Sequence, residues 1–267
     1  MRIDPDQTYI MPLVMGPVGD RPMARGAVYS EVETVSLQYR TTPEAIAALL
    51  PDCYQPTVKP VVTVAFIYND GVDFMAGRGY RIATVMVAAR YDGEQDHTEG
   101  NFAFVMFEDD TLPILLGRER LGVPKLYADI SPIRVLSDGH LRCEASLWGH
   151  LLFGIDVAPL AKQDDTIVAA ANESPRGLPL LGFKYISSPD GPPDAAYPIS
   201  TPSDRRLEGM SLGRSGRLFF GDPGAEDIGF IAGAIDALRT LPVLQVVGTS
   251  RSHSSSVLRT DLCRRLR

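Results

Sequence analysis

Residues 61–108 read "VVTVAFIYNDGVDFMAGRGYRIATVMVAARYDGEQDHTEGNFAFVMFE", and this stretch decides the fold. The segments 61–68, 80–91 and 101–108 are rich in β-branched and aromatic residues, which are typical of strands. Polar or glycine-containing turns separate the segments, so neighbouring strands are expected to pair antiparallel. An antiparallel sheet is therefore predicted at the centre of the fold.

Strand-like and irregular segments flank this stretch. Residues 111–117 and 140–149 are predicted to continue the strand pattern. Residues 187–204 are dense in proline, serine and aspartate and are predicted to form a long surface connection. The ending, 250–267, is basic, serine-rich and weakly patterned. It is predicted to be a frayed tail, with a lid over a pocket as the alternative.

Two helices are predicted. Residues 41–52 carry Thr42 as a cap and Pro43 in the first turn. Residues 225–243 place isoleucine and leucine side chains on one helical face. Few helices and many sequential strands indicate an α+β fold with antiparallel sheets, and closure of those sheets into a barrel is one arrangement of them.

The composition limits the class of protein. The chain has 267 residues, 45% hydrophobic and 22% charged, which is typical of a soluble globular protein with one large domain or two small ones. A formal net charge of -7 and a pI of about 5.1 argue against a nucleic-acid partner. No apolar run reaches the roughly 18–20 residues that a membrane-spanning helix needs.

The first residues and the cysteines bear on the compartment. The start carries Asp4 and Asp6 and lacks the basic and apolar regions of a signal peptide. Cys53, Cys143 and Cys263 are scattered and odd in number, so neither a disulfide framework nor a zinc pair is expected. A soluble cytoplasmic protein is therefore predicted.

Several motif-like stretches have ordinary explanations. "GMSLG" (209–213) matches the Gly-x-Ser-x-Gly pattern of serine hydrolases, but its flanks lack the strand and the helix that would expose Ser211. "AGRGY" (76–80) starts like a dinucleotide-binding loop, yet Ile82 stands where the third glycine belongs. "EDD" (108–110) is predicted to be a solvated acidic turn.

Lys125 is harder to place, because "LGVPKLY" (121–127) surrounds it with apolar residues and a proline. One interpretation is a lysine that packs its methylenes at a strand edge and keeps its ammonium in water. The other is a desolvated lysine, whose free amine attacks a ketone to form a Schiff base. The protonated imine then accepts the electrons of a breaking C–C or C–H bond.

The stretch "LGRERLGVPKLYADI" (116–130) resembles the signature of the acetoacetate decarboxylase family, in which Gly-Arg-Glu precedes a Pro-Lys that carries the Schiff-base lysine. Further segments resemble the family in the same order along the chain. They are "YRTTPEAIAALLPD" (39–52), "LLGFKYISSPDG" (180–191), "GRSGRLFF" (213–220) and "LRTLPVLQVVG" (238–248).

The resemblance implies a single domain over residues 1–267, built from antiparallel sheets that form a cone-like barrel with the lysine inside. It also implies a homo-oligomer that needs no metal and no organic cofactor. Lys125 would be the Schiff-base residue. Arg118 and Glu119 would lie in the pocket wall or form an ion pair that braces the lysine.

The chain also departs from the family pattern. Acetoacetate decarboxylases have a second lysine directly after the catalytic one, where this chain has Leu126. Two pocket glutamates of the decarboxylases correspond to positions near Ala65 and near Arg78, and an early pocket arginine corresponds to a position near Val32. Without the second lysine, desolvation would have to activate Lys125, unless Arg78 approaches it in space.

These observations favour a Schiff-base lyase that acts on a small or medium oxo acid, by decarboxylation or by aldol condensation and dehydration. Arg118 or Arg78 would hold the substrate carboxylate. Proton-transfer candidates are Glu119, Tyr80 and Tyr127. His253 is a further candidate, because the chain after Leu-Pro-Val returns near the lysine in this family; its alternative is a histidine in a disordered tail.

A non-catalytic or non-covalent binder of small molecules on the same scaffold is the competing hypothesis, because one fold hosts many functions. The two hypotheses differ in whether Lys125 forms an imine that borohydride can reduce.

Overall fold

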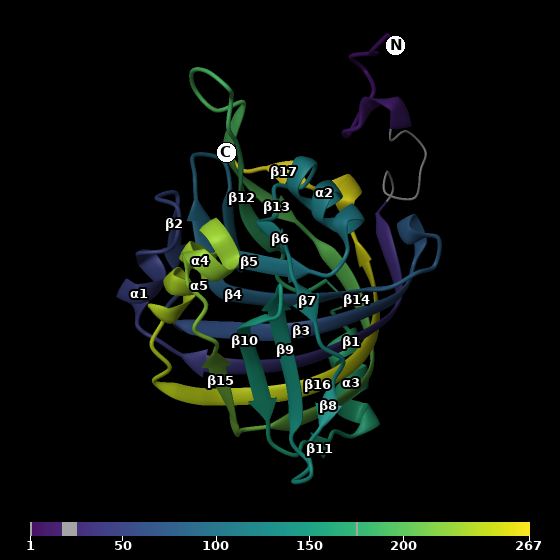
Figure 1. Cartoon of the computed structure of the whole chain (residues 1–267). Helices are drawn as coiled ribbons and strands as arrows, with labels where there is room; N and C mark the ends of the chain where they lie inside the picture. Colours follow the sequence, from purple (N-terminus) through teal and green to yellow (C-terminus); the bar gives the residue numbers. More distant parts are fainter. Residues whose placement is uncertain (1, 18–25, 175) are drawn as a thin grey trace.

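The computed structural model describes residues 2–17, 26–174 and 176–267, and two sheets dominate it (Figure 1). The larger sheet has 12 strands. Its strands are β1 (Ala27–Arg40), β2 (Tyr54–Pro56), β3 (Val61–Val72), β4 (Tyr80–Asp92), β5 (His97–Glu108), β6 (Lys125–Tyr127), β11 (Ala161–Lys162), β12 (Leu180–Ile186), β13 (Ala195–Thr201), β14 (Ser203–Gly213), β16 (Gln245–Leu258) and β17 (Arg264–Arg265). The smaller sheet has five, β7 (Asp129–Ile130), β8 (Arg134–Val135), β9 (Leu141–Leu147), β10 (His150–Val157) and β15 (Gly216–Phe220).

The three predicted central strands are present as β3, β4 and β5, and each pairs antiparallel with the next. Along the large sheet the order is β11-β14-β16-β1-β3-β4-β5-β12-β13-β17. Figure 1 shows the long strands of this sheet curving side by side. The α+β class is confirmed. Within the described chain the edge strands β11 and β17 do not pair with each other, so the sheet is strongly curved but not closed by hydrogen bonds.

The two faces of the large sheet have different partners because side chains alternate along each strand. On β3, Phe66 faces the small sheet, where its ring lies 5.8 Å from that of Phe153 on β10. Phe107 of β5 packs on the same ring at 6.0 Å. The opposite face of β3, represented by Ala65, lines a cavity. The hydrophobic core thus lies between the sheets, and the inner face of the large sheet encloses the cavity.

The described helices are short: α1 (Pro43–Ala47), α2 (Thr111–Glu119), α3 (Asp165–Asn172), α4 (Ala225–Ile228) and α5 (Ala232–Arg239). None of them is long and apolar enough to cross a bilayer. The helix predicted at 41–52 is present as α1 but is shorter, and its Thr42 hydroxyl accepts a hydrogen bond from the Ala45 amide at 3.2 Å. The helix predicted at 225–243 divides into α4 and α5, because Gly229 adopts a φ of 61° between them.

The prediction of a strand at 111–117 is wrong, because these residues form helix α2. Asp110 caps that helix: its carboxylate accepts a hydrogen bond from the Leu112 amide at 2.8 Å. Pro113 lies in the first turn, where its missing N–H leaves no intrahelical bond unmade. Over seven residues, the apolar pattern of a buried helix cannot be distinguished from that of a buried strand. The capping residue Asp110 is the feature that indicates a helix here.

Two predicted irregular segments contain strands. Of the surface connection predicted at 187–204, residues 195–201 form β13, and β14 begins at Ser203. The predicted tail at 250–267 begins inside β16, which pairs with β1 on one side and β14 on the other, so residues 250–258 lie within the sheet. Serine-rich composition hid this strand, because its inward side chains face the cavity and not an apolar core.

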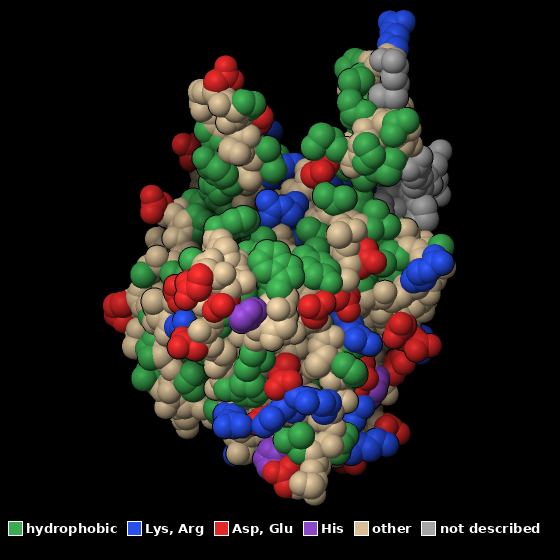
Figure 2. Space-filling model, viewed as in Figure 1, with side chains coloured by type: hydrophobic (Ala, Val, Ile, Leu, Met, Phe, Trp, Pro, Cys, Tyr) green, Lys and Arg blue, Asp and Glu red, His purple; other side chains and the backbone are tan. Residues whose placement is uncertain are grey.

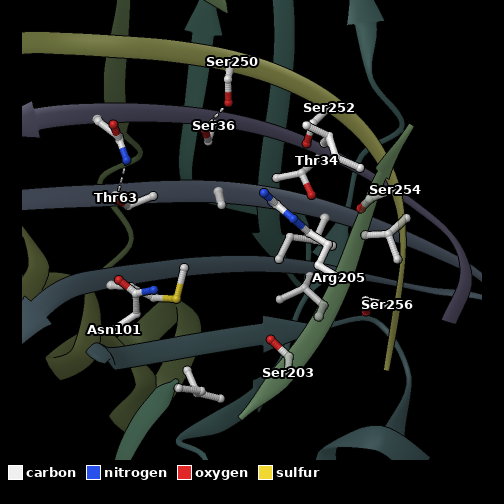
Figure 3. Close-up of a pocket in the computed structure, with 18 of the residues that line it drawn as sticks. Thr34, Ser36, Thr63, Asn101, Ser203, Arg205, Ser250, Ser252, Ser254 and Ser256 are labelled. Atoms are coloured by element: carbon white, nitrogen blue, oxygen red, sulfur yellow. Dashed lines mark hydrogen bonds between the residues drawn. The ribbon is translucent and has the colours of Figure 1, made fainter. Parts of the chain in front are cut away.

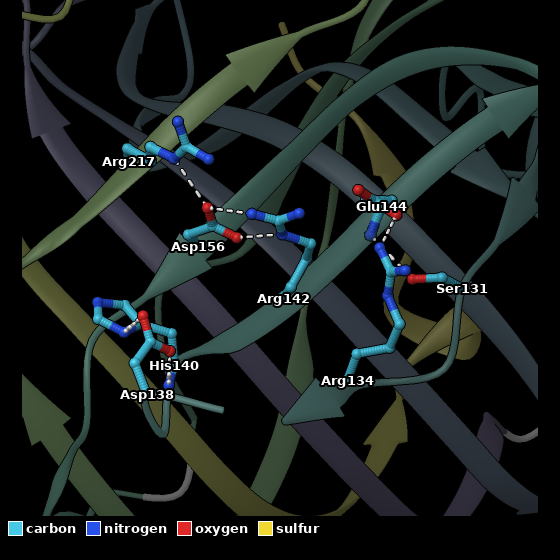
Figure 4. Close-up of polar contacts among 8 residues, drawn as sticks. All are labelled: Ser131, Arg134, Asp138, His140, Arg142, Glu144, Asp156 and Arg217. Atoms are coloured by element: carbon cyan, nitrogen blue, oxygen red, sulfur yellow. Dashed lines mark hydrogen bonds and ion pairs between the residues drawn. The ribbon is translucent and has the colours of Figure 1, made fainter. Parts of the chain in front are cut away.

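A row of charged residues crosses the outer face of the small sheet (Figure 4). Asp156 on β10 lies opposite Arg142 on β9 and Arg217 on β15. Its carboxylate accepts hydrogen bonds from Arg142 Nε and Nη2 at 2.5 and 2.8 Å and from Arg217 Nε at 2.7 Å. Basic and acidic side chains gather over this sheet in Figure 2. The Arg142 guanidinium, followed by that of Arg217, lowers the pKa of Asp156 against the opposing effect of burial.

We expect Asp156→Asn to lower the free energy of unfolding by about 1–3 kcal/mol at pH 7, because it removes charge-assisted hydrogen bonds from a buried acceptor. The pKa of Asp156 is lower in the folded chain, so its contribution is present above the unfolded pKa of about 3.9 and is lost as pH falls through the folded value. Urea denaturation between pH 3 and pH 7 measures this. An unchanged pH dependence in the variant would contradict the assignment.

Candidate active site

Lys125 is buried, with 7% of its surface exposed, and begins the short strand β6. Strand β6 runs parallel to β5, with Lys125 opposite Met106. The Nζ atom lies 2.7 Å from Oε1 of Glu108 and donates a hydrogen bond to the Pro113 carbonyl at 3.1 Å. Arg118 Nη1 donates a hydrogen bond to the Lys125 carbonyl at 2.9 Å, and this contact holds the backbone of Lys125 in place. The lysine is therefore held at both its backbone and its amine.

Glu108 is the charge partner of Lys125, and none of its surface is exposed. The 2.7 Å contact is mainly a charge contact, because within the described chain neither carboxylate oxygen has a hydrogen bond of ordinary geometry. Burial raises the pKa of Glu108, and the positive charge of Lys125 opposes that rise. A carboxyl group in this setting can give a proton to, and take it from, a reacting centre at the amine.

Gly117 of helix α2 makes room for the lysine. A β-carbon placed there would lie 2.3 Å from Cε, 2.4 Å from Cδ and 2.8 Å from Nζ of Lys125. The glycine of the Gly-Arg-Glu stretch is thus required by close packing against the lysine stem, and not by a turn.

We expect Gly117→Ala to displace the Lys125 amine and to reduce the rate of imine formation with a ketone by about 10- to 100-fold, since small misplacements of a reacting group are costly. Cyanoborohydride trapping followed by mass spectrometry measures this rate. Gly233→Ala in helix α5 is the matched control, because no atom lies within 4 Å of its added β-carbon. Equal trapping rates for the two variants would contradict the packing argument.

Lys125 lines a cavity of about 940 Å³. Figure 3 shows another part of the wall of this cavity. Near the lysine the wall is mainly apolar, with two tyrosines whose hydroxyls lie 3.3 Å apart, Tyr29 on β1 and Tyr80 on β4. Burial raises the pKa of Tyr29 to about 12 and that of Tyr80 well above its usual value. Both phenols are therefore protonated near neutral pH and can donate hydrogen bonds into the cavity.

A second part of the wall is polar and comes from β1, β14 and β16. Every second residue along parts of β1 and β16 turns a hydroxyl group toward the cavity. The guanidinium of Arg205, from β14, lines the same part of the wall (Figure 3). The hydroxyl-bearing residues of these strands that line the cavity are Thr34, Ser36, Ser203, Thr249, Ser250, Ser252, Ser254 and Ser256.

Of the predicted site residues, Tyr80 lies with Lys125 on the cavity wall. Arg118 is exposed and braces the lysine backbone without lining the cavity. Glu119 forms no ion pair with Arg118; its Oε2 accepts a hydrogen bond from the Met11 amide at 3.1 Å, outside the cavity. Bracing is therefore supported for Arg118, through a carbonyl and not through Glu119.

The other three predicted residues lie away from the lysine. Arg78 is exposed in the turn before β4 and does not line the cavity. Tyr127 is 41% exposed, and its hydroxyl donates to Asp129 at 2.9 Å. His253 lies on β16 with its ring on the face opposite the cavity, where Nε2 is 3.7 Å from Glu33. The strand period places its neighbours Ser252 and Ser254 inward instead.

Sequence reasoning missed Glu108, Tyr29 and Arg205. The solvated turn predicted at 108–110 is wrong at its first residue, because β5 extends to Glu108 and turns it inward. The available signal was alternation: Met106 and Glu108 share a face of the strand. Of the positions that differ from the family pattern, Val32 and Ala65 line the cavity.

Comparison with known proteins places this chain in a family. Residues 10–263 match the model of the family described as "Acetoacetate decarboxylase (ADC)". The chain is 31% identical over 162 residues to acetoacetate decarboxylase 1 of Bradyrhizobium diazoefficiens, and the match covers 55% of this chain and 61% of that one. The matched part thus spans about six tenths of the length of that curated relative.

Two solved structures have a similar fold. The crystal structure of acetoacetate decarboxylase from Legionella pneumophila has a TM-score of 0.72 and 22% identity, covering 91% of this chain and 88% of that chain. The enduracididine biosynthesis enzyme MppR, solved with pyruvate, has a TM-score of 0.70 and 16% identity, covering 97% of both chains.

Proposed function

This chain belongs to the acetoacetate decarboxylase family, and on that basis we propose that it is a lyase that binds an oxo acid as a Schiff base on Lys125. The observation that carries the proposal is the Lys125 amine, buried beside Glu108 and opening into the cavity. A lysine held in this way has lost most of its hydration, which favours its use as a nucleophile. The solvent-exposed lysine that the sequence also allowed has no support here.

In the first step Lys125 Nζ attacks the carbonyl carbon of the oxo acid. The carbonyl oxygen takes up protons and leaves as water, and a C=N bond forms. Glu108, 2.7 Å from Nζ, is the group placed to supply a proton to the departing oxygen and then to face the iminium as a carboxylate. The raised pKa of Glu108 suits it to both roles.

From the iminium the reaction divides. In decarboxylation the C–C bond breaks, its electrons move to the iminium nitrogen, and carbon dioxide leaves. In condensation a proton leaves the adjacent carbon, and the enamine attacks an aldehyde, after which water is lost. Apolar side chains such as Ile82 and Met106 favour the first route, since it converts a carboxylate into a neutral product. The size of the cavity leaves room for the second reactant of the other route.

The hydroxyls of Tyr29 and Tyr80 are the proposed proton carriers for the enamine carbon. They lie 3.3 Å apart on the cavity wall, and both phenols remain protonated at neutral pH. One hydroxyl can pass a proton to the carbon while the other replaces it.

The test is borohydride reduction in the presence of acetoacetate and, separately, pyruvate, followed by intact mass and peptide mapping. The chain has four lysines, so the modified residue can be assigned directly: Lys59, Lys125, Lys162 and Lys184. We expect one adduct on Lys125 and an unchanged yield for Lys162→Ala, a lysine on the exposed edge strand β11. An adduct elsewhere, or none, would contradict the proposal. Release of carbon dioxide from acetoacetate then separates the two routes.

A further inference from the structure

The charges on the cavity wall are unbalanced. Three basic residues line it, Lys125, Arg205 and Arg214, whereas its described lining contains no aspartate or glutamate. Lys125 is matched by the buried Glu108 behind it. Neither Arg205 nor Arg214 has an ion pair within the described chain, and Arg205 extends over the cavity from β14 (Figure 3). The wall therefore presents an uncompensated guanidinium to whatever fills the cavity.

Two serine hydroxyls on the cavity wall have no hydrogen-bond partner in the part of the chain that the structure describes. Ser252 and Ser254 on β16 are only 7% and 3% exposed, and both line the cavity. Neither hydroxyl makes a hydrogen bond to any described residue, whereas the next serine along, Ser250, bonds to Ser36 at 2.8 Å. These two hydroxyls are thus available as donors to a ligand oxygen.

The strand registers connect this region to the lysine. Arg205 lies directly opposite Ser256 on β16, which lies opposite Tyr29 on β1. Neighbouring strands are about 4.8 Å apart, so the Cα atoms of Arg205 and Tyr29 are separated by roughly 10 Å. The Tyr29 hydroxyl lies 3.3 Å from that of Tyr80, and Glu108, the charge partner of Lys125, is close enough to act on both phenols. One extended small molecule can therefore contact both regions.

We propose that Arg205, with the hydroxyls of Ser252 and Ser254, forms a second anion subsite that binds the distal carboxylate of an oxo dicarboxylic acid held at Lys125. The inference rests on the proposed function for the covalent end of the substrate. A guanidinium fork matches the two oxygens of a carboxylate, and the serine hydroxyls supply further donors. Neither Arg118 nor Arg78 can take this part, because both lie outside the cavity.

Two substrates that differ in one group test the subsite. 2-Oxoadipate and 2-oxohexanoate have six carbons each, but only the first carries a distal carboxylate. We expect half-maximal borohydride trapping on the wild-type chain at an about 10- to 100-fold lower concentration of 2-oxoadipate, as a charge-assisted hydrogen-bonded pair implies. Arg205→Gln should remove that preference. Arg206→Gln, the next residue on β14 and outside the cavity lining, should keep it.

A non-covalent arm separates this inference from the Schiff-base proposal. Adipate has no ketone and cannot form an imine, so its calorimetric binding, compared with that of hexanoate, reports non-covalent contacts alone. Binding of adipate that depends on Arg205 supports the subsite even if no imine is trapped. The absence of a trapped imine would overturn only the proposed function. The subsite is overturned if Arg205→Gln and Arg206→Gln, folded to the same extent, bind adipate as wild type does, or if the trapping preference survives Arg205→Gln.

Discussion

Lys125→Met is expected to slow the exchange of pyruvate methyl protons with deuterium by at least about 1000-fold, because exchange requires an enamine and the enamine requires the amine. Methionine keeps an unbranched apolar stem of similar length, so the packing against Gly117 is retained. Proton NMR in deuterium oxide follows the loss of the methyl signal. This exchange requires the iminium on Lys125, which is the intermediate that decarboxylation and condensation share.

The control for this variant is Lys162→Met on the exposed strand β11, which should exchange at the wild-type rate. Circular dichroism confirms that both variants are folded. Exchange by folded Lys125→Met within tenfold of wild type would show that another group forms the imine, or that exchange proceeds without one.

Glu108→Ala is expected to lower the free energy of unfolding by about 3–5 kcal/mol, because it leaves the Lys125 ammonium buried and unpaired. The double variant Glu108→Leu, Lys125→Met should recover most of that loss, since it replaces the ion pair by apolar side chains of comparable size. Urea denaturation of Glu108→Leu, Lys125→Met and the double variant measures the coupling. If the double variant is no more stable than Glu108→Ala, the loss of stability in Glu108→Ala does not come from the unpaired Lys125 ammonium.

The partner variant Lys125→Met should show a characteristic pH dependence. Burial raises the pKa of Glu108, and removal of the ammonium removes the main opposing effect. A folded pKa above the unfolded value, about 4.3, means that stability is fully present below that value and is lost as pH rises through the folded pKa. The variant should thus be destabilised relative to wild type at pH 7 and much less so at pH 4.

The sequence was sufficient for the elements whose side chains follow a packing pattern. The strands β3, β4 and β5 alternate branched and aromatic residues because one face is the core. The cap at Thr42 marked α1. Lys125 could be singled out because a charge amid apolar residues is itself a signal. In each case the information lies within a few neighbouring residues.

The remainder of the site depends on long-range pairing. Arg205 and Ser256 are adjacent only because β14 and β16 pair, and nothing local marks either residue as part of a cavity. The sequence of β16 resembles a polar tail because its serines face the cavity. Side chains that contact solvent or a ligand there do not have to be apolar. The apolar run at 111–117 was ambiguous because either a strand or a helix can bury such a run.

The division of the large sheet into a core face and a cavity face has a consequence for how this protein can change. Residues such as Phe66 support the fold through the small sheet, whereas Ala65, its immediate neighbour, lines the cavity. Substitutions on the second face therefore alter the shape and charge seen by a substrate with little loss of stability. Two adjacent residues can therefore evolve under separate selection, one for stability and one for substrate specificity. This property makes such a sheet a good starting point for laboratory evolution.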